Sequence, residues 1–140
     1  MTLVIDANIA VKWFIRQPDS QLARDLHAVD ERLIAPDMVI AEVANTLWRY
    51  TKTREITPDR AVEAIATLPI MLRELVPVEV LAVPALQLAF ALDSAVYDCL
   101  YAVLALERKC GFVTADRKFA ERLRASRRLS GVKLLADFAP

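Results

Sequence analysis

Four acidic residues of this 140-residue chain stand where carboxylates can do chemistry: Asp6, Glu42, Asp98 and Asp116. Two of them directly or closely follow short apolar runs, and the other two lie in segments with helical periodicity. Carboxylates without Cys or His partners suit hard cations such as Mg²⁺ or Mn²⁺. Clustered carboxylates that hold such ions commonly cut phosphodiesters, because one ion activates water and another stabilises the leaving oxygen. Metal-dependent phosphodiester hydrolysis is therefore the chemistry that this set suggests.

Short apolar runs that alternate with helical segments predict how these acids are positioned. The strand candidates are Leu3 to Ile5, Leu33 to Ala35, Leu75 to Val80, Phe112 to Thr114 and Val132 to Leu135. Continuous apolar strands separated by helices indicate an α/β fold with a parallel sheet covered on both faces. No repeat, low-complexity tract or linker divides the chain, and 140 residues with 56% apolar content suffice for a core. We expect residues 1–140 to form a single domain.

Helix boundaries can be read from three short stretches. Pro36-Asp37 opens a helix that runs to about Lys52, and Thr57-Pro58-Asp59 caps another. Asp93-Ser94 precedes an apolar helix that ends before Gly111, which we expect to act as its C-terminal stop.

The four acids are predicted to meet at one edge of the sheet. In an open α/β sheet, ligands bind beyond the carboxyl ends of the strands, toward which the following helices point their N-termini. Each acid also has an ordinary explanation: Asp6 and Asp116 as N-caps, Asp98 as a partner of its helix dipole, and Glu42 as a solvent-facing side chain. Together, four carboxylates at one edge would repel one another unless a cation neutralised them.

Cysteine and histidine content argues against a zinc or disulfide protein. Cys99 and Cys110 stand at the two ends of one predicted helix, at a spacing that suits neither a disulfide framework nor a zinc site. The single histidine, His27, falls in a predicted surface helix away from the acids. The first residues show no basic segment followed by a long apolar run, and no stretch approaches the roughly 20 apolar residues that span a bilayer. We expect a soluble, cytoplasmic protein without membrane contact.

Charge is balanced overall and uneven along the chain. Formal net charge is zero, yet from Arg108 onward nine Lys and Arg stand against three acids, so this part carries about +6 and the rest about −6. A basic region of this kind is typical either of a surface that meets phosphate or of a solvated helix face, and composition alone leaves both open.

Four motifs together resemble the PIN domain, in the arrangement of the VapC toxins of bacterial toxin–antitoxin modules. They are "VIDAN", the Glu42 of "APDMVIAEVANTL", "SAVYDCLYAVLALE" and "FVTADRKFA", and the resemblance runs from Leu3 to about Leu135. It implies a PIN-like three-layer α/β/α sandwich with a mostly parallel five-stranded sheet. It also implies a Mg²⁺- or Mn²⁺-dependent endoribonuclease, with one or two ions, that a small VapB-like antitoxin neutralises.

The resemblance assigns the acidic site to Asp6, Glu42, Asp98 and Asp116, the same four residues. We expect Asp6 and Asp98 to be the principal metal ligands, Asp116 to complete the site or hold a second ion, and Glu42 to orient water. Asn8 and Thr114 are expected to position an acid by hydrogen bonding, although Asn8 also suits a helix cap. Some relatives carry a further acid just beyond the last motif, where this chain has Arg117-Lys118.

RNA contact is assigned to the basic residues that follow the last acid: Arg117, Lys118 and Arg122. Transfer or ribosomal RNA is the expected substrate class. Trp13 and Trp48 could stack on bases, but their apolar helical patterns favour core or interface packing. Lys12 neighbours the first motif and is either functional or an ordinary helix lysine.

Partners follow partly from the resemblance. We expect a homodimer and an antitoxin groove between the helices that contain "VANTLWRY" and "VEAIATLPIML". The alternatives are a PIN nuclease for RNA maturation without antitoxin and a non-catalytic PIN-like module that binds RNA or protein. A receiver domain is disfavoured because it needs an adjacent acid pair after the first strand. A haloacid-dehalogenase-like phosphatase would carry an acid at the position of Asn8.

Overall fold

A five-stranded parallel sheet organises the computed structural model, which describes residues 1–29 and 32–138. The strands are β1 (Thr2–Ile5), β2 (Arg32–Pro36), β3 (Glu74–Val76), β4 (Gly111–Thr114) and β5 (Val132–Leu134). Their order across the sheet is β3-β2-β1-β4-β5, and every neighbouring pair is parallel. The predicted parallel α/β fold is confirmed.

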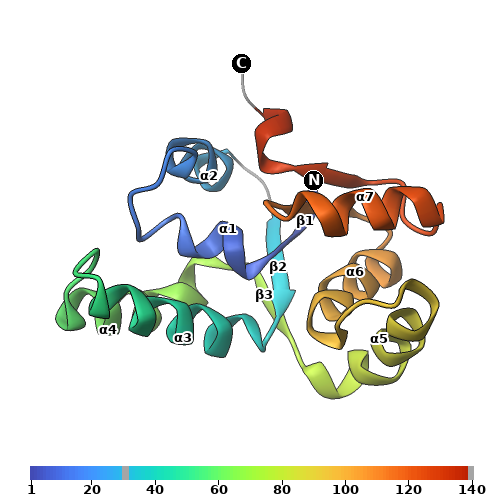
Figure 1. The fold of residues 1–140 in the computed structure, drawn as a ribbon, viewed down its shortest axis with the longest axis horizontal. Coiled ribbons are helices and arrows are strands. Elements are labelled where there is room, and N and C mark those ends of the chain that lie inside the picture. Colours follow the sequence, from blue (N-terminus) through green and yellow to red (C-terminus); the bar gives the residue numbers. More distant parts are fainter. Residues whose placement is uncertain (30–31, 139–140) are drawn as a thin grey trace.

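Helices cover the two faces of this sheet. They are α1 (Ala7–Val11), α2 (Ser20–Ala28), α3 (Val39–Lys52), α4 (Pro58–Met71), α5 (Val78–Leu92), α6 (Val96–Arg108) and α7 (Arg117–Ser126), with a short 3-10 turn, η1 (Leu135–Phe138). Figure 1 shows α1 to α4 on one side of the sheet and α5 to α7 on the other. The strand order requires this arrangement. The connections from β1 to β2 and from β2 to β3 run in one direction across the sheet, whereas those from β3 to β4 and from β4 to β5 run in the other. Right-handed crossovers in opposite directions place their helices on opposite faces. The fold is a three-layer α/β/α sandwich.

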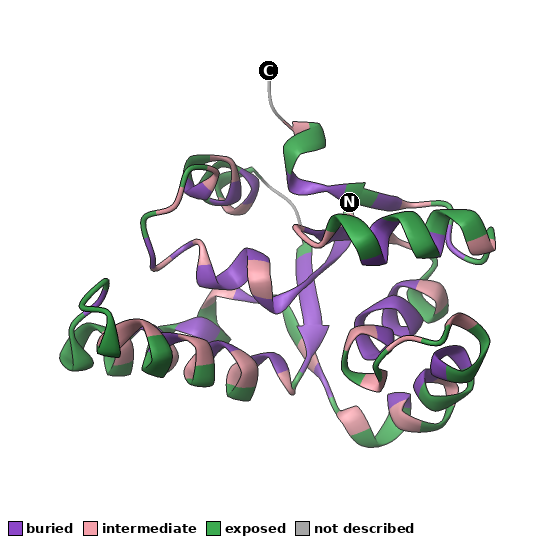
Figure 2. Ribbon diagram, in the orientation of Figure 1, coloured by how far each residue is buried: buried purple, intermediate pink, exposed green. Residues whose placement is uncertain are grey.

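The core fills both faces of the sheet, and on one of them the helix α6 is its main component. Residues Cys99 to Ala105 of α6 are all buried, as are Val4, Ile5 and Phe112 of the sheet (Figure 2). This explains why α6 is apolar without a polar face over most of its length.

Of the described helices, none is by itself long and apolar enough to cross a membrane. The pair α5 and α6 reaches that length and apolarity only together, across a bend of 112°.

Three boundaries differ from those predicted. The helix expected to open at Pro36-Asp37 begins at Val39, and Pro36 is the last residue of β2. The strand expected over Leu75 to Val80 ends at Val76, because Pro77 has no N–H to donate and serves as the N-cap of α5. The helix α6 ends as expected before Gly111, but its stop is Lys109 in the left-handed conformation (φ 52°). Gly111 instead begins β4, where an added Cβ would lie 2.8 Å from Cδ2 of Leu3.

Other boundaries agree with the predictions to within one residue. The helix α3 ends at Lys52, and Thr57 caps α4 by accepting a hydrogen bond from the N–H of Arg60, with Pro58 as the first helical residue. The last strand ends one residue before the predicted Leu135.

Candidate active site

Asp6 lies at the centre of the sheet edge, at the end of β1 and next to the end of β4. These two strands are the point at which the chain order reverses across the sheet, and in such folds the crevice at the switch point is where ligands bind. Asp6 is the N-cap of α1 and only 6% exposed. Its Oδ2 accepts a hydrogen bond from the hydroxyl of Thr114 (2.8 Å) and one from Nδ2 of Asn8 (3.3 Å).

Thr114 and Asn8 form one network beneath this carboxylate. The single proton of the Thr114 hydroxyl goes to Asp6, and its oxygen accepts from Nδ2 of Asn8 (3.3 Å) and the N–H of Asp116 (3.0 Å). Oδ1 of Asn8 accepts from the N–H of Ala115 (3.0 Å). Asn8 is the second residue of α1 and not a cap, so its side chain ties the two strand ends together.

Glu42 lies on the same side of the sheet as Asn8, in the first turn of α3. Its Oε1 accepts a hydrogen bond of 2.7 Å from the hydroxyl of Tyr101, a core residue of α6 that is 1% exposed. Tyr101 lies three residues after Asp98, on the same side of α6. The tyrosine thus connects the two helices that carry acids.

Asp98 and Asp116 occupy helix starts, as expected. Asp98 lies in the first turn of α6 and is half-buried. Asp116 is the N-cap of α7, and its Oδ1 accepts from the N–H of Phe119 (3.1 Å). The helix-capping role considered for Asp116 is therefore confirmed, and its other carboxylate oxygen, Oδ2, takes no part in the cap.

The ionisation of these acids shows that they share one electrostatic environment. Burial raises the pKa of Asp6 to about 7, with the charges of Asp98 and Glu42 adding to the rise and the Thr114 hydrogen bond opposing it. Burial followed by the charge of Asp98 raises the pKa of Glu42, although the Tyr101 hydrogen bond lowers it. Burial and the charge of Asp116 raise the pKa of Asp98. Asp6, Glu42 and Asp98 therefore act on one another, and Asp116 acts on Asp98, so the four predicted acids form one connected set.

A divalent cation fits this site by donor chemistry. The available donors are carboxylate oxygens, three of whose residues (Asp6, Glu42 and Asp98) line one cleft, and Mg²⁺ and Mn²⁺ prefer oxygen donors of this kind. Within residues 1–29 and 32–138, no three His, Cys, Asp or Glu side chains are already arranged to hold an ion. Protein hydrogen bonds engage one carboxylate oxygen in each of three of the four acids: Asp6, Glu42 and Asp116.

An open cleft of about 410 Å³ leads to the carboxylates. Its lining includes Asp6, Glu42 and Asp98, together with polar residues of α1, the following loop and α3: Asn8, Lys12, Gln17, Thr46, Arg49 and Tyr50. Apart from Asn8 and Lys12, these polar residues were not singled out in the sequence. The signal that would have found them is their spacing after Glu42 on α3, at four, seven and eight positions. Tyr101 was also missed, although its spacing from Asp98 places it on the same helix face.

The residues predicted to bind RNA lie at the start of α7. Arg117 and Lys118 are exposed next to Asp116. Arg122 has contacts within the protein, since its Nη1 donates to the carbonyl of Asp93 (2.8 Å) and the hydroxyl of Ser94 (2.9 Å). This guanidinium fastens α7 to the turn between α5 and α6.

The predictions for the two tryptophans and the histidine are confirmed only in part. Trp13 is buried and its Nε1 donates to the carbonyl of Ala23 (2.9 Å), so packing is confirmed for this residue. Trp48 is 55% exposed on α3. His27 lies on α2 as predicted, but it is half-buried against the ring of Trp13, with 4.9 Å between centroids.

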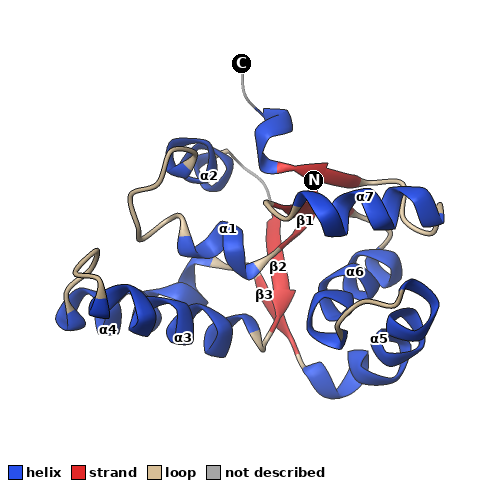
Figure 3. Ribbon diagram, in the orientation of Figure 1, coloured by secondary structure: helices blue, strands red, loops and turns tan. Residues whose placement is uncertain are grey.

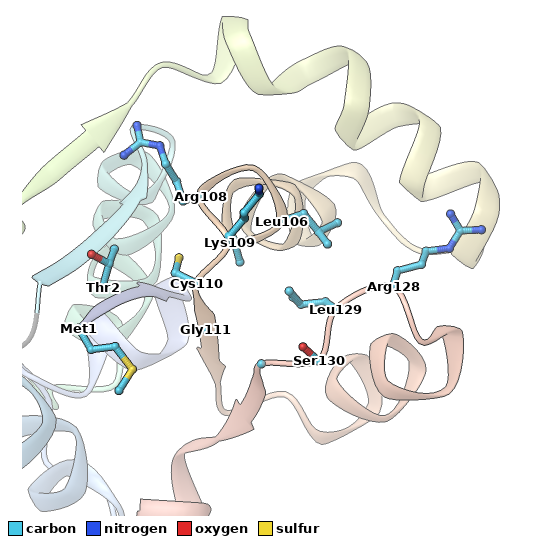
Figure 4. A pocket seen from close by; sticks show the side chains of 12 residues that line it. Met1, Thr2, Leu106, Arg108, Lys109, Cys110, Gly111, Arg128, Leu129 and Ser130 are labelled. Atoms are coloured by element: carbon cyan, nitrogen blue, oxygen red, sulfur yellow. The ribbon is translucent and has the colours of Figure 1, made fainter.

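A larger cavity, of about 630 Å³, opens at the opposite end of the sheet (Figure 4). It lies beside the first residues of β1 and β4, and Arg108, Lys109 and Arg128 are its charged side chains. None of the described residues that line it is acidic. This cavity is separate from the carboxylate site because the two lie at opposite strand ends.

The comparisons with known proteins agree on one family. The family model for the PIN domain matches residues 3–123. A curated protein of Pyrobaculum aerophilum named Ribonuclease VapC3 is 29% identical over 128 residues, which are 89% of this chain and 97% of that protein.

Two solved structures share the fold. PAE2754 from Pyrobaculum aerophilum superposes with a TM-score of 0.70 at 18% identity, over 98% of this chain and 91% of that one. VapBC2 from Rickettsia felis, solved bound to a DNA fragment from its promoter, gives a TM-score of 0.62 at 16% identity, over 96% and 98% of the two chains.

Proposed function

The chain belongs to the PIN domain family, and we propose that it is an endoribonuclease that acts as the VapC-like toxin of a VapBC toxin–antitoxin pair, with residues 1–140 as one PIN domain in the cytoplasm. The observation that carries the proposal is the convergence of Asp6, Glu42, Asp98 and Asp116 on the switch-point edge of the sheet. A named ribonuclease that aligns over nearly its whole length supports the same activity.

The cofactor we propose is Mg²⁺ or Mn²⁺, as one or two ions. Asp6 and Asp98 are assigned as principal ligands, Asp116 as the residue that completes the site or holds a second ion, and Glu42 as a ligand or water-orienting group. When bound, such an ion lowers the pKa of water and stabilises negative charge on the phosphate.

The chain's own residues prepare the site for this chemistry. Thr114 and Asn8 fix the orientation of Asp6, so its carboxylate does not need to be ordered during the reaction. Tyr101 holds Oε1 of Glu42, and we assign the second oxygen of Glu42 to orienting the attacking water. The raised pKa of Glu42 suits a group that takes a proton from that water.

Cleavage of total cellular RNA by the purified protein tests the activity. We expect cleavage with Mg²⁺ or Mn²⁺ and none with a chelator. Asp98→Asn should abolish it, because the change keeps the size of the side chain and removes its charge. Asp59→Asn is the matched control, since Asp59 is an exposed acid in the first turn of α4. Cleavage that is equal in wild type and Asp98→Asn, or absent from folded wild type, would refute the assignment.

RNA is the proposed substrate, with transfer or ribosomal RNA as its class and Arg117 and Lys118 as phosphate contacts. Both are exposed beside Asp116 at the edge that carries the acids. Reversing both charges should weaken RNA cleavage without unfolding the protein, which circular dichroism would monitor. An unchanged rate would remove these residues from the RNA site.

The antitoxin site that we propose is the groove between α3 and α4. An apolar cavity of about 450 Å³ lies there, with Leu47 at its base and the exposed side chains of Trp48 and Val62 beside it. A VapBC complex among the structural neighbours is consistent with such a partner. Val62→Glu should prevent co-purification with the antitoxin encoded beside the gene. Ile70→Glu is the matched control, because Ile70 is an exposed apolar residue of the same helix outside the groove. Equal co-purification would place the antitoxin elsewhere.

We also propose a homodimer. The helix α5 carries exposed apolar side chains at Val80, Val83 and Phe90, and Tyr97 follows at the start of α6. Contiguous exposed apolar surface of this kind is typical of an interface. Sedimentation of the antitoxin-free chain should give twice the monomer mass, and Phe90→Glu should give the monomer. A monomeric wild type at high concentration would exclude the dimer.

A further inference from the structure

The cleft that contains the carboxylates continues along α3, where polar side chains that can donate hydrogen bonds line it. These residues, here called the wall, are Lys12, Gln17, Thr46, Arg49 and Tyr50. Thr46, Arg49 and Tyr50 follow Glu42 at intervals of four, seven and eight residues, so they share one face of α3. A rise of 1.5 Å per residue puts Arg49 about 10 Å along the helix from Glu42. Lys12 and Gln17, from the end of α1 and the loop that leads to α2 (Figure 3), line the same cleft.

Side-chain hydrogen bonds hold this wall together across three segments. The ammonium of Lys12 donates to Oε1 of Gln17 (2.8 Å) and pairs with Oδ1 of Asp19 (2.8 Å). Nε2 of Gln17 donates to the hydroxyl oxygen of Tyr50 (2.8 Å). The Lys12 side chain is only 12% exposed, so its charge has a fixed position in the cleft.

The wall has more donors than these bonds use. Two of the three N–H groups of Lys12 are engaged. The guanidinium of Arg49 has five N–H groups, and in the described part of the chain its hydrogen bond is a long one, 3.4 Å, to Thr46. The Tyr50 hydroxyl accepts from Gln17, which leaves its own proton for an acceptor. Two cations and a hydroxyl therefore present donors to the cleft.

We propose that Lys12, Arg49 and Tyr50 form a phosphate-binding subsite that holds the RNA backbone beside the carboxylate site. A phosphodiester is anionic and accepts hydrogen bonds only, which matches a wall of cationic and hydroxyl donors. The subsite lies on the α1 and α3 side of the sheet, whereas Arg117 and Lys118 lie on α7, which covers the other face. The identification of the anion as RNA rests on the proposed function.

Binding of a fluorescent single-stranded RNA of about 12 nucleotides, measured with a chelator present so that no cleavage occurs, tests the subsite. We expect Lys12→Gln and Arg49→Gln each to weaken binding roughly tenfold. The slope of log affinity against log salt should fall in magnitude by about 0.7 for each lost phosphate contact. Lys52→Gln is the matched control, because Lys52 is on the same helix and stands over the ring of Trp48 outside the cleft.

A second pair of variants separates phosphate binding from a bracing role. Lys12→Arg keeps the positive charge and should therefore retain most of the RNA affinity that Lys12→Gln loses. Asp19→Asn should bind RNA at least as tightly as wild type, because it removes a competing negative charge. A wall that only braces the loop predicts weaker binding for Asp19→Asn. Loss of antitoxin binding with unchanged RNA affinity would assign the wall to an acidic peptide and overturn the proposal.

The RNA cleavage assay on the same proteins keeps the two proposals distinguishable. Metal-dependent cleavage by wild type, with RNA affinity and salt slope unchanged in Lys12→Gln and Arg49→Gln, would overturn the subsite and leave the nuclease function standing. Binding with the expected slopes but no cleavage would support the subsite and count against the nuclease. Failure of wild type to bind the RNA would overturn the subsite.

Discussion

Asp6→Asn should stabilise the metal-free protein at neutral and alkaline pH while removing its activity. Asp6 is buried near two other acids, and its pKa rises from 3.8 to about 7 in the folded protein. Between these values the folded protein binds more protons than the unfolded chain, so the free energy of unfolding falls as pH increases. The penalty is fully present above about pH 7 and disappears below about pH 4. An asparagine has no such charge and no such dependence.

The size of the effect follows from the pKa difference. At about 1.4 kcal/mol per pKa unit, the raised pKa of Asp6 lowers the free energy of unfolding by about 4 kcal/mol at about pH 8 and by about 1.5 kcal/mol at about pH 5. The stability of Asp6→Asn relative to wild type should therefore increase by about 2.5 kcal/mol between these two conditions. Changes in the hydrogen bonds from Thr114 and Asn8 contribute equally at both and cancel.

Urea unfolding with a chelator at about pH 5 and about pH 8 measures this difference, and Asp59→Asn provides the control. A stability difference that is the same at both pH values would refute the reasoning, because burial would then not raise the pKa of Asp6. Adding Mn²⁺ at about pH 8 should stabilise wild type more than Asp6→Asn, since an ion that binds only the folded state shifts unfolding by mass action.

Three further changes have expected outcomes. Tyr101→Phe removes the hydrogen bond to Glu42 and should lower metal-dependent RNA cleavage about tenfold with little change in thermal midpoint. Thr114→Val leaves the N–H of Asp116 without its partner and should destabilise the fold by about 1–3 kcal/mol in urea unfolding, whereas Thr114→Ser should restore most of it. Glu74→Gln breaks the exposed ion pair with Arg108 of α6 and should change the free energy of unfolding by less than about 1 kcal/mol. A larger loss in urea unfolding would contradict the expectation that solvent screens this pair.

The sheet was predictable from the sequence because its strands are buried on both faces. Leu3 to Ile5 and Phe112 to Thr114 are continuous apolar runs, and such runs occur where helices cover a sheet on both sides. The predicted strand over Leu75 to Val80 failed for a related reason. Its apolar pattern continues from β3 into α5, and apolar residue type by itself does not distinguish a short strand from the start of a helix.

Chain order also predicted which end of the sheet carries the acids. A carboxylate that follows a parallel strand must lie at the carboxyl edge, which places Asp6 and Asp116 without any knowledge of packing. Residue type then predicted the class of ligand, because oxygen donors without nitrogen or sulfur favour hard cations.

Only the tertiary structure decided what holds and surrounds those acids. The contact of Thr114 with Asp6 joins residues 108 positions apart, and that of Tyr101 with Glu42 joins residues 59 apart. The cleft wall of Lys12, Gln17 and Tyr50 depends on how a loop folds against α3. Local propensity contains no information on such pairings, because they arise from packing across the sheet. The sequence by itself determined the fold class and the candidate acids. Packing determined the raised pKa values of Asp6, Glu42 and Asp98, the side chains that support the acids and the donors beside them.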